Sequence, residues 1–190
     1  MQAARGASLN PGDPDPDPAR QARRPLLLFA ATATTAYLLD LVTKTLAVQH
    51  LQGRDPVPLV GDLLQLTFVR NPGAAFSTGT SYTIVLSFIA IGAVGFVLFA
   101  ARRLTNMLWA FGLGCLLGGV LGNLTDRVFR EPGFLRGHVI DFLQLPRWPV
   151  FNIADMCINI AAAVIILQAI RGVSHVGAKS EPEDAETPAP

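Results

Sequence analysis

The stretch "YTIVLSFIAIGAVGFVLFAA", residues 82 to 101, contains no charged residue. An apolar run of about 20 residues is long enough to cross the hydrocarbon core of a bilayer as an α-helix. The composition of the whole chain agrees, because it is 51% apolar and only 15% charged, whereas about a quarter of the residues of a soluble domain are charged. This stretch therefore predicts a membrane protein.

Three further apolar segments accompany it, at residues 25–48, 106–124 and 154–170. Each approaches the length that a spanning helix needs. Four spans place both termini on one side of the membrane. Arginines before the first segment and between the second and third mark that side as cytoplasmic by the positive-inside rule. We therefore predict an α-helical membrane protein with four transmembrane helices and both termini in the cytoplasm.

The two ends of the chain have a different composition. Residues 1–24 alternate Asp with Pro, and residues 173–190 end in "AKSEPEDAETPAP". Neither end has an apolar period, so both are predicted to be disordered tails. The membrane domain is predicted at residues 25–172.

The loop between the first two apolar segments predicts β-structure. Residues 64–69, "LQLTFV", alternate and are rich in β-formers, and Asn-Pro-Gly follows at 71–73 as a turn signal. We expect a small β-sheet on the outer membrane face, followed by a tight turn. In the third apolar segment Gly114, Gly118 and Gly122 recur every four residues, which predicts a face for close helix packing.

Composition also argues against several functions. The net charge is only +1, and no basic stripe with interleaved aromatics occurs, so no nucleic-acid partner is expected. No organic cofactor is expected, because water activated by carboxylate groups requires none. The cysteines and histidines share no metal-ligand spacing, so we expect no metal site. They are Cys115, Cys157, His50, His138 and His175.

Polar residues gather at one predicted depth, the outer interface. They are Asp40, Lys44, Asn71, Asn123, Asp126, Arg127, Asp141, Asn152 and Asp155. Ionisable residues in or near hydrocarbon are costly and indicate function. This convergence is the main sign of a site.

Several of these residues also have a structural interpretation. Asp40 and Lys44 lie four residues apart and can form an ion pair, with Lys44 reaching outward. Asp126 can cap the third helix or anchor it at the headgroups, and we favour that role. Asn152 can cap the fourth helix, where the helix dipole favours Asp155. These alternatives stay open at this point.

Asp141 is harder to explain structurally. We place it in the loop of residues 125–153, among apolar side chains and without a cation at helical spacing. Burial without a cation raises the pKa of a carboxyl group. If Asp141 faces Asp155, the two can share one proton and activate a water molecule.

Two other classes of protein also fit the residues alone. A small proton-coupled transporter would use Asp40, Asp141 and Asp155 as a proton relay. A membrane assembly factor would use the glycine face to dimerise. The transporter predicts ionisable groups at mid-membrane and often an internal repeat, and neither is found in the sequence.

Five motifs decide between these classes. In chain order they are "DLVTK" at 40–44, "NPGAAFS" at 71–77, "GGVLGNLTDR" at 118–127, "HVIDF" at 138–142 and "FNIAD" at 151–155. In this order and spacing the chain resembles the bacterial lipoprotein signal peptidases, also called signal peptidase II, over residues 25–172. Each motif is weak alone, but five in register are specific.

The resemblance implies an aspartic endopeptidase of the bacterial cytoplasmic (inner) membrane, with its site near the outer face and acting as a monomer. Its substrates would be diacylglyceryl-modified prolipoproteins, cut just before the lipidated cysteine. The catalytic pair would be Asp141 and Asp155, and Asp126 would lie outside the pair. The resemblance further implies supporting roles for Asp40, Lys44, Asn71, Asn123, Arg127 and Asn152.

Overall fold

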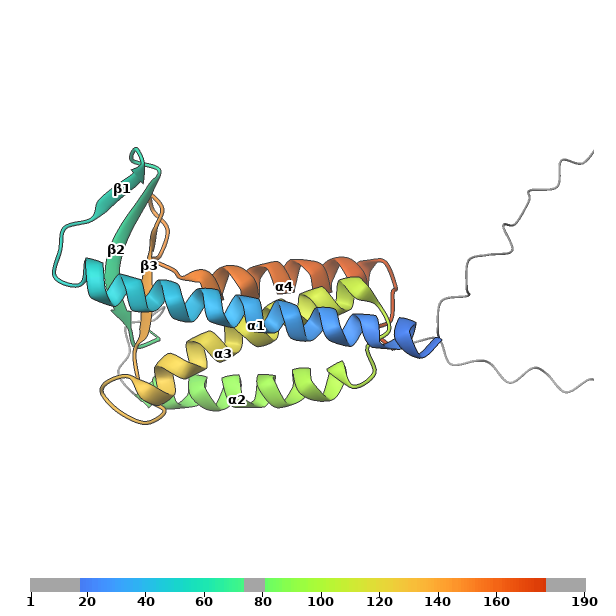
Figure 1. Ribbon diagram of the computed structural model, residues 1–190. Helices are drawn as coiled ribbons and strands as arrows, with labels where there is room; N and C mark the ends of the chain where they lie inside the picture. The colour runs from blue at the N-terminus through green and yellow to red at the C-terminus, as the bar shows by residue number, and fades with distance from the viewer. Residues whose placement is uncertain (1–17, 74–80, 177–190) are drawn as a thin grey trace, which may run out of the picture.

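The computed structural model describes residues 18–73 and 81–176. In this part of the chain four helices run side by side, and a small sheet lies across one end of the bundle (Figure 1). All four are long and apolar enough to cross a membrane. The predicted fold class is therefore confirmed. The helices are α1 (Pro18–Leu51), α2 (Ser81–Ala101), α3 (Met107–Phe129) and α4 (Ile153–Ile170).

Helices α2 and α4 begin one residue before the predicted apolar segments, and α1 and α3 exceed theirs by several residues. Helix α1 begins at Pro18 rather than at residue 25, and α3 continues five residues past 124 to Phe129. The predicted C-terminal tail also begins with a residue that contacts the bundle, because the Trp109 indole N–H donates to the Val173 carbonyl oxygen at 2.8 Å. The rest of the predicted tails, residues 1–17 and 177–190, lies outside the described residues.

The sheet has three antiparallel strands in the order β1-β2-β3. They are β1 (Val57–Val60), β2 (Leu64–Asn71) and β3 (Val139–Gln144). Strand β2 contains the "LQLTFV" stretch from which a short sheet was predicted, and it pairs with β1 in an antiparallel hairpin. The third was expected to be loop, and it carries Asp141 opposite Val69 of β2. The predicted loop around Asp141 was therefore wrong, because Asp141 lies in a paired strand.

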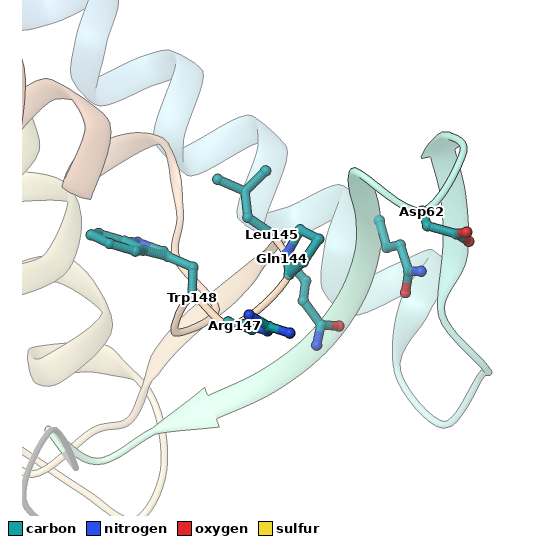
Figure 2. A pocket seen from close by; sticks show the side chains of 7 residues that line it. Asp62, Gln144, Leu145, Arg147 and Trp148 are labelled. Atoms are coloured by element: carbon teal, nitrogen blue, oxygen red, sulfur yellow. The ribbon is translucent and has the colours of Figure 1, made fainter.

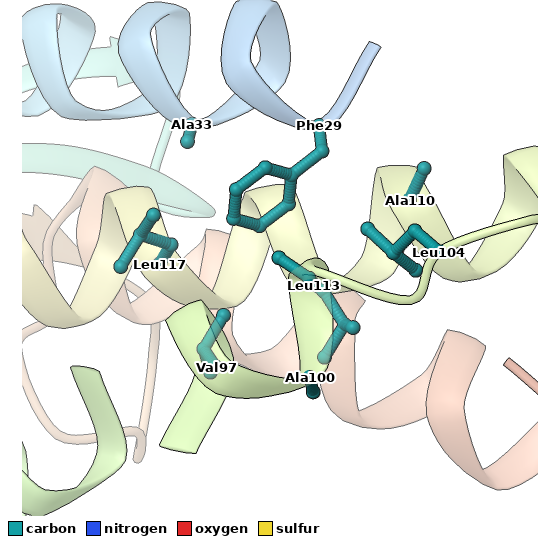
Figure 3. Packing of buried hydrophobic residues seen from close by; sticks show 9 residues of the cluster. Phe29, Ala33, Val97, Ala100, Leu104, Ala110, Leu113 and Leu117 are labelled. Atoms are coloured by element: carbon teal, nitrogen blue, oxygen red, sulfur yellow. The ribbon is translucent and has the colours of Figure 1, made fainter. Parts of the chain in front are cut away.

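An apolar cluster holds the bundle together at the end away from the sheet. Phe29 of α1 lies over Leu113 and Leu117 of α3, and Val97 of α2 meets them from the other side (Figure 3). A smaller cluster attaches the sheet to the end of α1 through Ala47, Leu51, Ile140 and Phe142. The sheet is therefore fixed to the helices at the end of the bundle where α1 ends.

The glycines of α3 bring its backbone close to two neighbours. A Cβ added at Gly118 would lie 2.6 Å from the Ala33 carbonyl oxygen of α1, and one added at Gly114 would lie 2.8 Å from that of Phe29. On another face, a Cβ at Gly119 would lie 2.6 Å from the Ala154 carbonyl oxygen of α4. The predicted packing role of the glycines is confirmed, and α3 is the central helix.

Candidate active site

The first turn of α4 is held by its own cap. The Asn152 side chain accepts from the Asp155 backbone N–H at 2.9 Å, and the Asp155 carboxylate accepts from the Asn152 backbone N–H at 3.2 Å. This reciprocal capping box satisfies two N–H groups that a helix start leaves free. It confirms the predicted cap and fixes the Asp155 side chain, which is partly exposed.

Strand β3 brings the second carboxylate to the same place. Asp141 is only 2% exposed. One of its oxygens accepts from the Asn152 amide at 2.6 Å and the other from the Asn71 amide at 2.8 Å. Asn71 ends β2 and also accepts from the Gly73 N–H in a tight turn. Asn152 therefore contacts both Asp141 and Asp155.

Asn123 of α3 completes the set of amides. Its NH₂ group donates to Asp155 Oδ1 at 2.8 Å, while Asn152 Nδ2 lies 3.2 Å from its oxygen. Each oxygen of Asp141 and Asp155 thus accepts an N–H donor from one of three asparagines. A carboxylate oxygen has more than one lone pair, so each can still accept a water or carry a proton.

Burial is the main cause of the altered acidity of Asp141. Burial and, to a smaller extent, the charge of Asp155 raise the pKa of this carboxyl group, the Asn71 and Asn152 amides lower it, and the net result is a pKa of about 6. The rise has the predicted direction. A carboxyl group with a pKa near neutral can act as a proton donor or acceptor under physiological conditions.

Asp40 and Lys44 form the predicted ion pair, with 2.7 Å between Lys44 Nζ and Asp40 Oδ2. However, Lys44 does not reach outward as expected, because it is 1% exposed and Asp40 is fully buried. A second acceptor draws it inward, since Lys44 Nζ also lies 3.0 Å from Asp126. The ammonium belongs to the interior of the bundle.

The preferred interpretation of Asp126, as a helix cap or headgroup anchor, was wrong. Asp126 is 2% exposed and pairs with both Lys44 and Arg130. Asp126 also contacts strand β3, because its carboxylate accepts from the Ile140 backbone N–H at 3.1 Å. Two cations and one N–H hold this carboxylate in the interior. Among the described residues, the hydrogen bonds and ion pairs of the Asp126 carboxylate go to Lys44, Arg130 and Ile140 and not to Asp141 or Asp155.

Arg127, one turn after Asn123, donates to the Asn123 carbonyl oxygen at 3.2 Å. The structure therefore brings the predicted site residues to one end of the bundle, at the junction of α1, α3, α4 and the sheet. They are Asp40, Lys44, Asn71, Asn123, Arg127, Asp141, Asn152 and Asp155.

Two residues that shape this junction were not among the predicted site residues. Arg130 pairs with Asp126, and the spacing of four within one helix could have suggested it. Gly137 donates its N–H to the Arg127 carbonyl at 2.9 Å, and a Cβ there would collide with the last carbonyls of α3. The only feature of the sequence that could have indicated this role is the position of Gly137 directly before "HVIDF".

Beyond the carboxylates, β3 leads to a polar pocket of about 370 Å³. It lies between the β1–β2 turn, which carries Asp62, and the segment after β3, which carries Arg147 and Trp148 (Figure 2). On the α1 side of the sheet, a groove of about 400 Å³ is lined mostly by apolar side chains, among them Leu46, Leu66 and Phe142. Both lie at the same end of the bundle as the carboxylates.

Known proteins are similar in sequence to most of this chain. The family model described as signal peptidase (SPase) II matches residues 32–171. The lipoprotein signal peptidase of Mycobacterium avium (strain 104) is 49% identical over 164 residues, covering 85% of this chain and 90% of that protein. That of Leifsonia xyli subsp. xyli (strain CTCB07) is 47% identical over 161 residues, covering 84% of this chain and 74% of that protein.

Solved structures agree on the fold. A bacterial membrane enzyme determined by the in meso method at 1.9 Å resolution superposes with a TM-score of 0.67 at 25% identity, covering 78% of this chain and 93% of that one. Another, at 2.3 Å resolution, gives the same TM-score at 24% identity and covers 84% of this chain. A match of the family model to most of the chain, together with relatives near half identity, means that the chain belongs to the signal peptidase II family, the membrane aspartic peptidases that remove signal peptides from prolipoproteins.

Proposed function

We propose that Asp141 and Asp155 are the catalytic pair of this peptidase. The observation that carries the proposal is Asn152, which donates its side-chain amide to Asp141 and its backbone N–H to Asp155. One residue therefore sets the relative position of two carboxylates that come from a strand and a helix. Asn71 and Asn123 support the same arrangement from β2 and α3.

The chemistry follows from two carboxyl groups that share one proton. The ionised member takes a proton from a water molecule, whose oxygen attacks the carbonyl carbon of the scissile peptide bond. The neutral member donates its hydrogen bond to the carbonyl oxygen as negative charge develops there. The amine then leaves with a proton from the pair. The raised pKa of Asp141, about 6, favours a pair that keeps one proton near neutral pH.

We assign supporting roles to six residues. Asn71, Asn123 and Asn152 orient the carboxylates through their amides, and Arg127 holds the backbone of Asn123. Asp40 and Lys44 form a buried ion pair that contacts Ala154 and Asn123 beside the two catalytic carboxylates. Because all these residues belong to one chain, a monomer supplies a complete site.

The substrate that fits this site is a prolipoprotein whose cysteine already carries a diacylglyceryl group, with cleavage just before that cysteine. A lipid anchor holds the scissile bond at the membrane surface. Strand β3 and the first turn of α4, which carry Asp141 and Asp155, lie at one end of the spanning bundle (Figure 1). The mostly apolar groove beside Phe142 offers a surface for hydrocarbon at that level. A proton relay through mid-membrane, as a transporter needs, has no support in this arrangement or in the family.

The test compares two substrates. Wild-type protein, as single copies in lipid nanodiscs, is given a diacylglyceryl-modified precursor and the same precursor without lipid. We expect the lipidated form to be cleaved at least about 100-fold faster, because the anchor replaces a bimolecular search with a positioned encounter. Mass spectrometry of the products should place the new N-terminus at the lipidated cysteine. Equal rates for both substrates would contradict the assigned substrate class.

We propose further that the sheet and the carboxylates face the outside of the cytoplasmic membrane, with both termini in the cytoplasm. The arginines near the start of α1 and after α2 support this orientation. In a background of Cys115→Ala and Cys157→Ala, Asp62→Cys at the β1–β2 turn is expected to react with an impermeant thiol reagent added to intact cells (Figure 2).

Arg103→Cys provides the matched control. Arg103 is equally exposed but lies in the loop between α2 and α3, at the opposite end of the bundle. It should react only after the membrane is opened. The reverse pattern of labelling would invert the orientation.

A further inference from the structure

Lys44 is a charged residue in the bundle interior that makes three polar contacts. Its ammonium nitrogen lies 2.7 Å from Asp40 Oδ2 and 3.0 Å from Asp126 Oδ2, and it donates to Asn123 Oδ1 at 2.9 Å. An ammonium group carries three N–H donors and no acceptor. Each of the three oxygen-bearing residues makes a further contact toward the pair of carboxylates.

The first contact leads to helix α4. Asp40 uses its other oxygen, Oδ1, to accept from the Ala154 backbone N–H at 2.9 Å. Ala154 directly precedes Asp155. A carboxylate at the start of a helix is favoured by the free N–H groups and by the helix dipole. Asp40, held by Lys44, therefore fixes the helix start from which Asp155 projects.

The second contact leads to strand β3. Asp126 Oδ2, which faces Lys44, also accepts from the Ile140 backbone N–H at 3.1 Å. Ile140 directly precedes Asp141. The other oxygen of Asp126 binds Arg130. Asp126 therefore ties the strand that carries Asp141 to the same ammonium group.

The third contact sets the orientation of an amide. An asparagine side chain can present either its oxygen or its NH₂ group to a neighbour. Lys44 can only donate, so together with the Asn152 amide, 3.2 Å away, it holds the Asn123 oxygen as the acceptor, and this turns the Asn123 NH₂ group toward Asp155 Oδ1 at 2.8 Å. With the amide reversed, its oxygen would face a carboxylate oxygen.

We propose that Lys44 is a positioning residue for peptide cleavage, acting through Asp40, Asp126 and Asn123 to hold Asp141 and Asp155 in their relative places. The inference rests on the catalytic pair proposed above and goes beyond charge compensation. Compensation requires only that the buried charges balance, and Arg130 already pairs with Asp126. Positioning requires that one donor reach all three residues at once.

The test uses Lys44→Met, which keeps an unbranched side chain one heavy atom shorter and removes the ammonium. We expect kcat to fall about 100-fold, because a displacement of about 1 Å in reacting groups costs about that much. KM for the lipidated precursor should stay within about threefold, since the substrate does not contact the buried lysine. Thermal unfolding of the purified protein in detergent is measured beside turnover.

A second variant separates positioning from charge balance. Lys44→Met combined with Asp40→Asn leaves Arg130 and Asp126 as a balanced pair, and the asparagine can still accept from Ala154. We expect this double variant to unfold near the wild-type temperature and to keep the loss in kcat. If it regains wild-type turnover, Lys44 only neutralises charge and the inference is overturned.

Gln168→Met is the matched control, because Gln168 is a buried polar residue, 2% exposed, at the opposite end of the bundle. Its kcat should match wild type, and an equal fall would show that any buried polar loss has this effect and overturn the inference. Asp141→Asn runs in the same series. If it is inactive while both Lys44 variants turn over normally, positioning fails and the catalytic pair stands. If Asp141→Asn is active, the proposed pair itself fails.

Discussion

Asp141→Asn and Asp155→Asn are each expected to lower the rate of prolipoprotein cleavage by about 10³-fold or more, because each removes one partner of the acid–base pair. The variants should still fold. Asparagine has the volume of aspartate, and replacing Asp141 removes a carboxylate that is only 2% exposed. Cleavage of the lipidated precursor is followed by gel shift, with the unfolding temperature measured on the same samples.

Glu131→Gln is the matched control for these replacements. Glu131 is 87% exposed and pairs with Arg70 at 3.2 Å on the surface, and exposed ion pairs contribute little to stability. It should cleave at the wild-type rate. Asp126→Asn should lose less activity than either member of the pair. An equal loss in folded Asp126→Asn would return Asp126 to the catalytic candidates.

Gly118→Val is expected to destabilise the bundle by about 2 kcal/mol or more, since overpacking a close contact costs about 1–3 kcal/mol. Even a Cβ at Gly118 would lie 2.6 Å from both the Ala33 carbonyl oxygen and Ala36 Cβ of α1. Without a hydrophobic driving force in lipid, helices associate through such close packing. Separation of α1 from α3 would also pull Lys44 away from Asn123, so activity should fall as well.

Gly92→Val makes the same chemical change where space is available. Gly92 lies on the exposed surface of α2, and apart from the neighbouring backbone of α2 itself no atom of the described residues lies within 4 Å of a Cβ built there. Its unfolding temperature in detergent should remain near that of the wild type, or rise slightly. Equal effects of the two valines would mean that the α1–α3 contact is not as tight as the structure has it.

Hydropathy alone predicted the four spans because a bilayer imposes one length on every helix that crosses it. Strand β3 was not predicted, for a physical reason. Its first four residues, including Asp141, are buried on both faces of the sheet, so "VIDFLQ" lacks the alternation that marks a half-exposed strand. A short apolar run of this kind fits several local structures.

The site could be predicted only in part for a similar reason. Asp40 and Lys44 share a helix face four residues apart, and that spacing is visible in the sequence. The contact of Lys44 with Asn123 joins residues 79 positions apart, and no local pattern encodes it. Lys44 was therefore expected to point outward, whereas packing of α1 on the glycines of α3 turns it inward.

The central claim is that Asp141 and Asp155 together cut a lipidated prolipoprotein. It is tested most directly by cleavage of the lipidated precursor in one nanodisc preparation, comparing wild type with Asp141→Asn and Asp155→Asn. The wild type should cleave completely before the lipidated cysteine, and neither folded variant should cleave in the same time. Cleavage by either variant at a rate near wild type would contradict it.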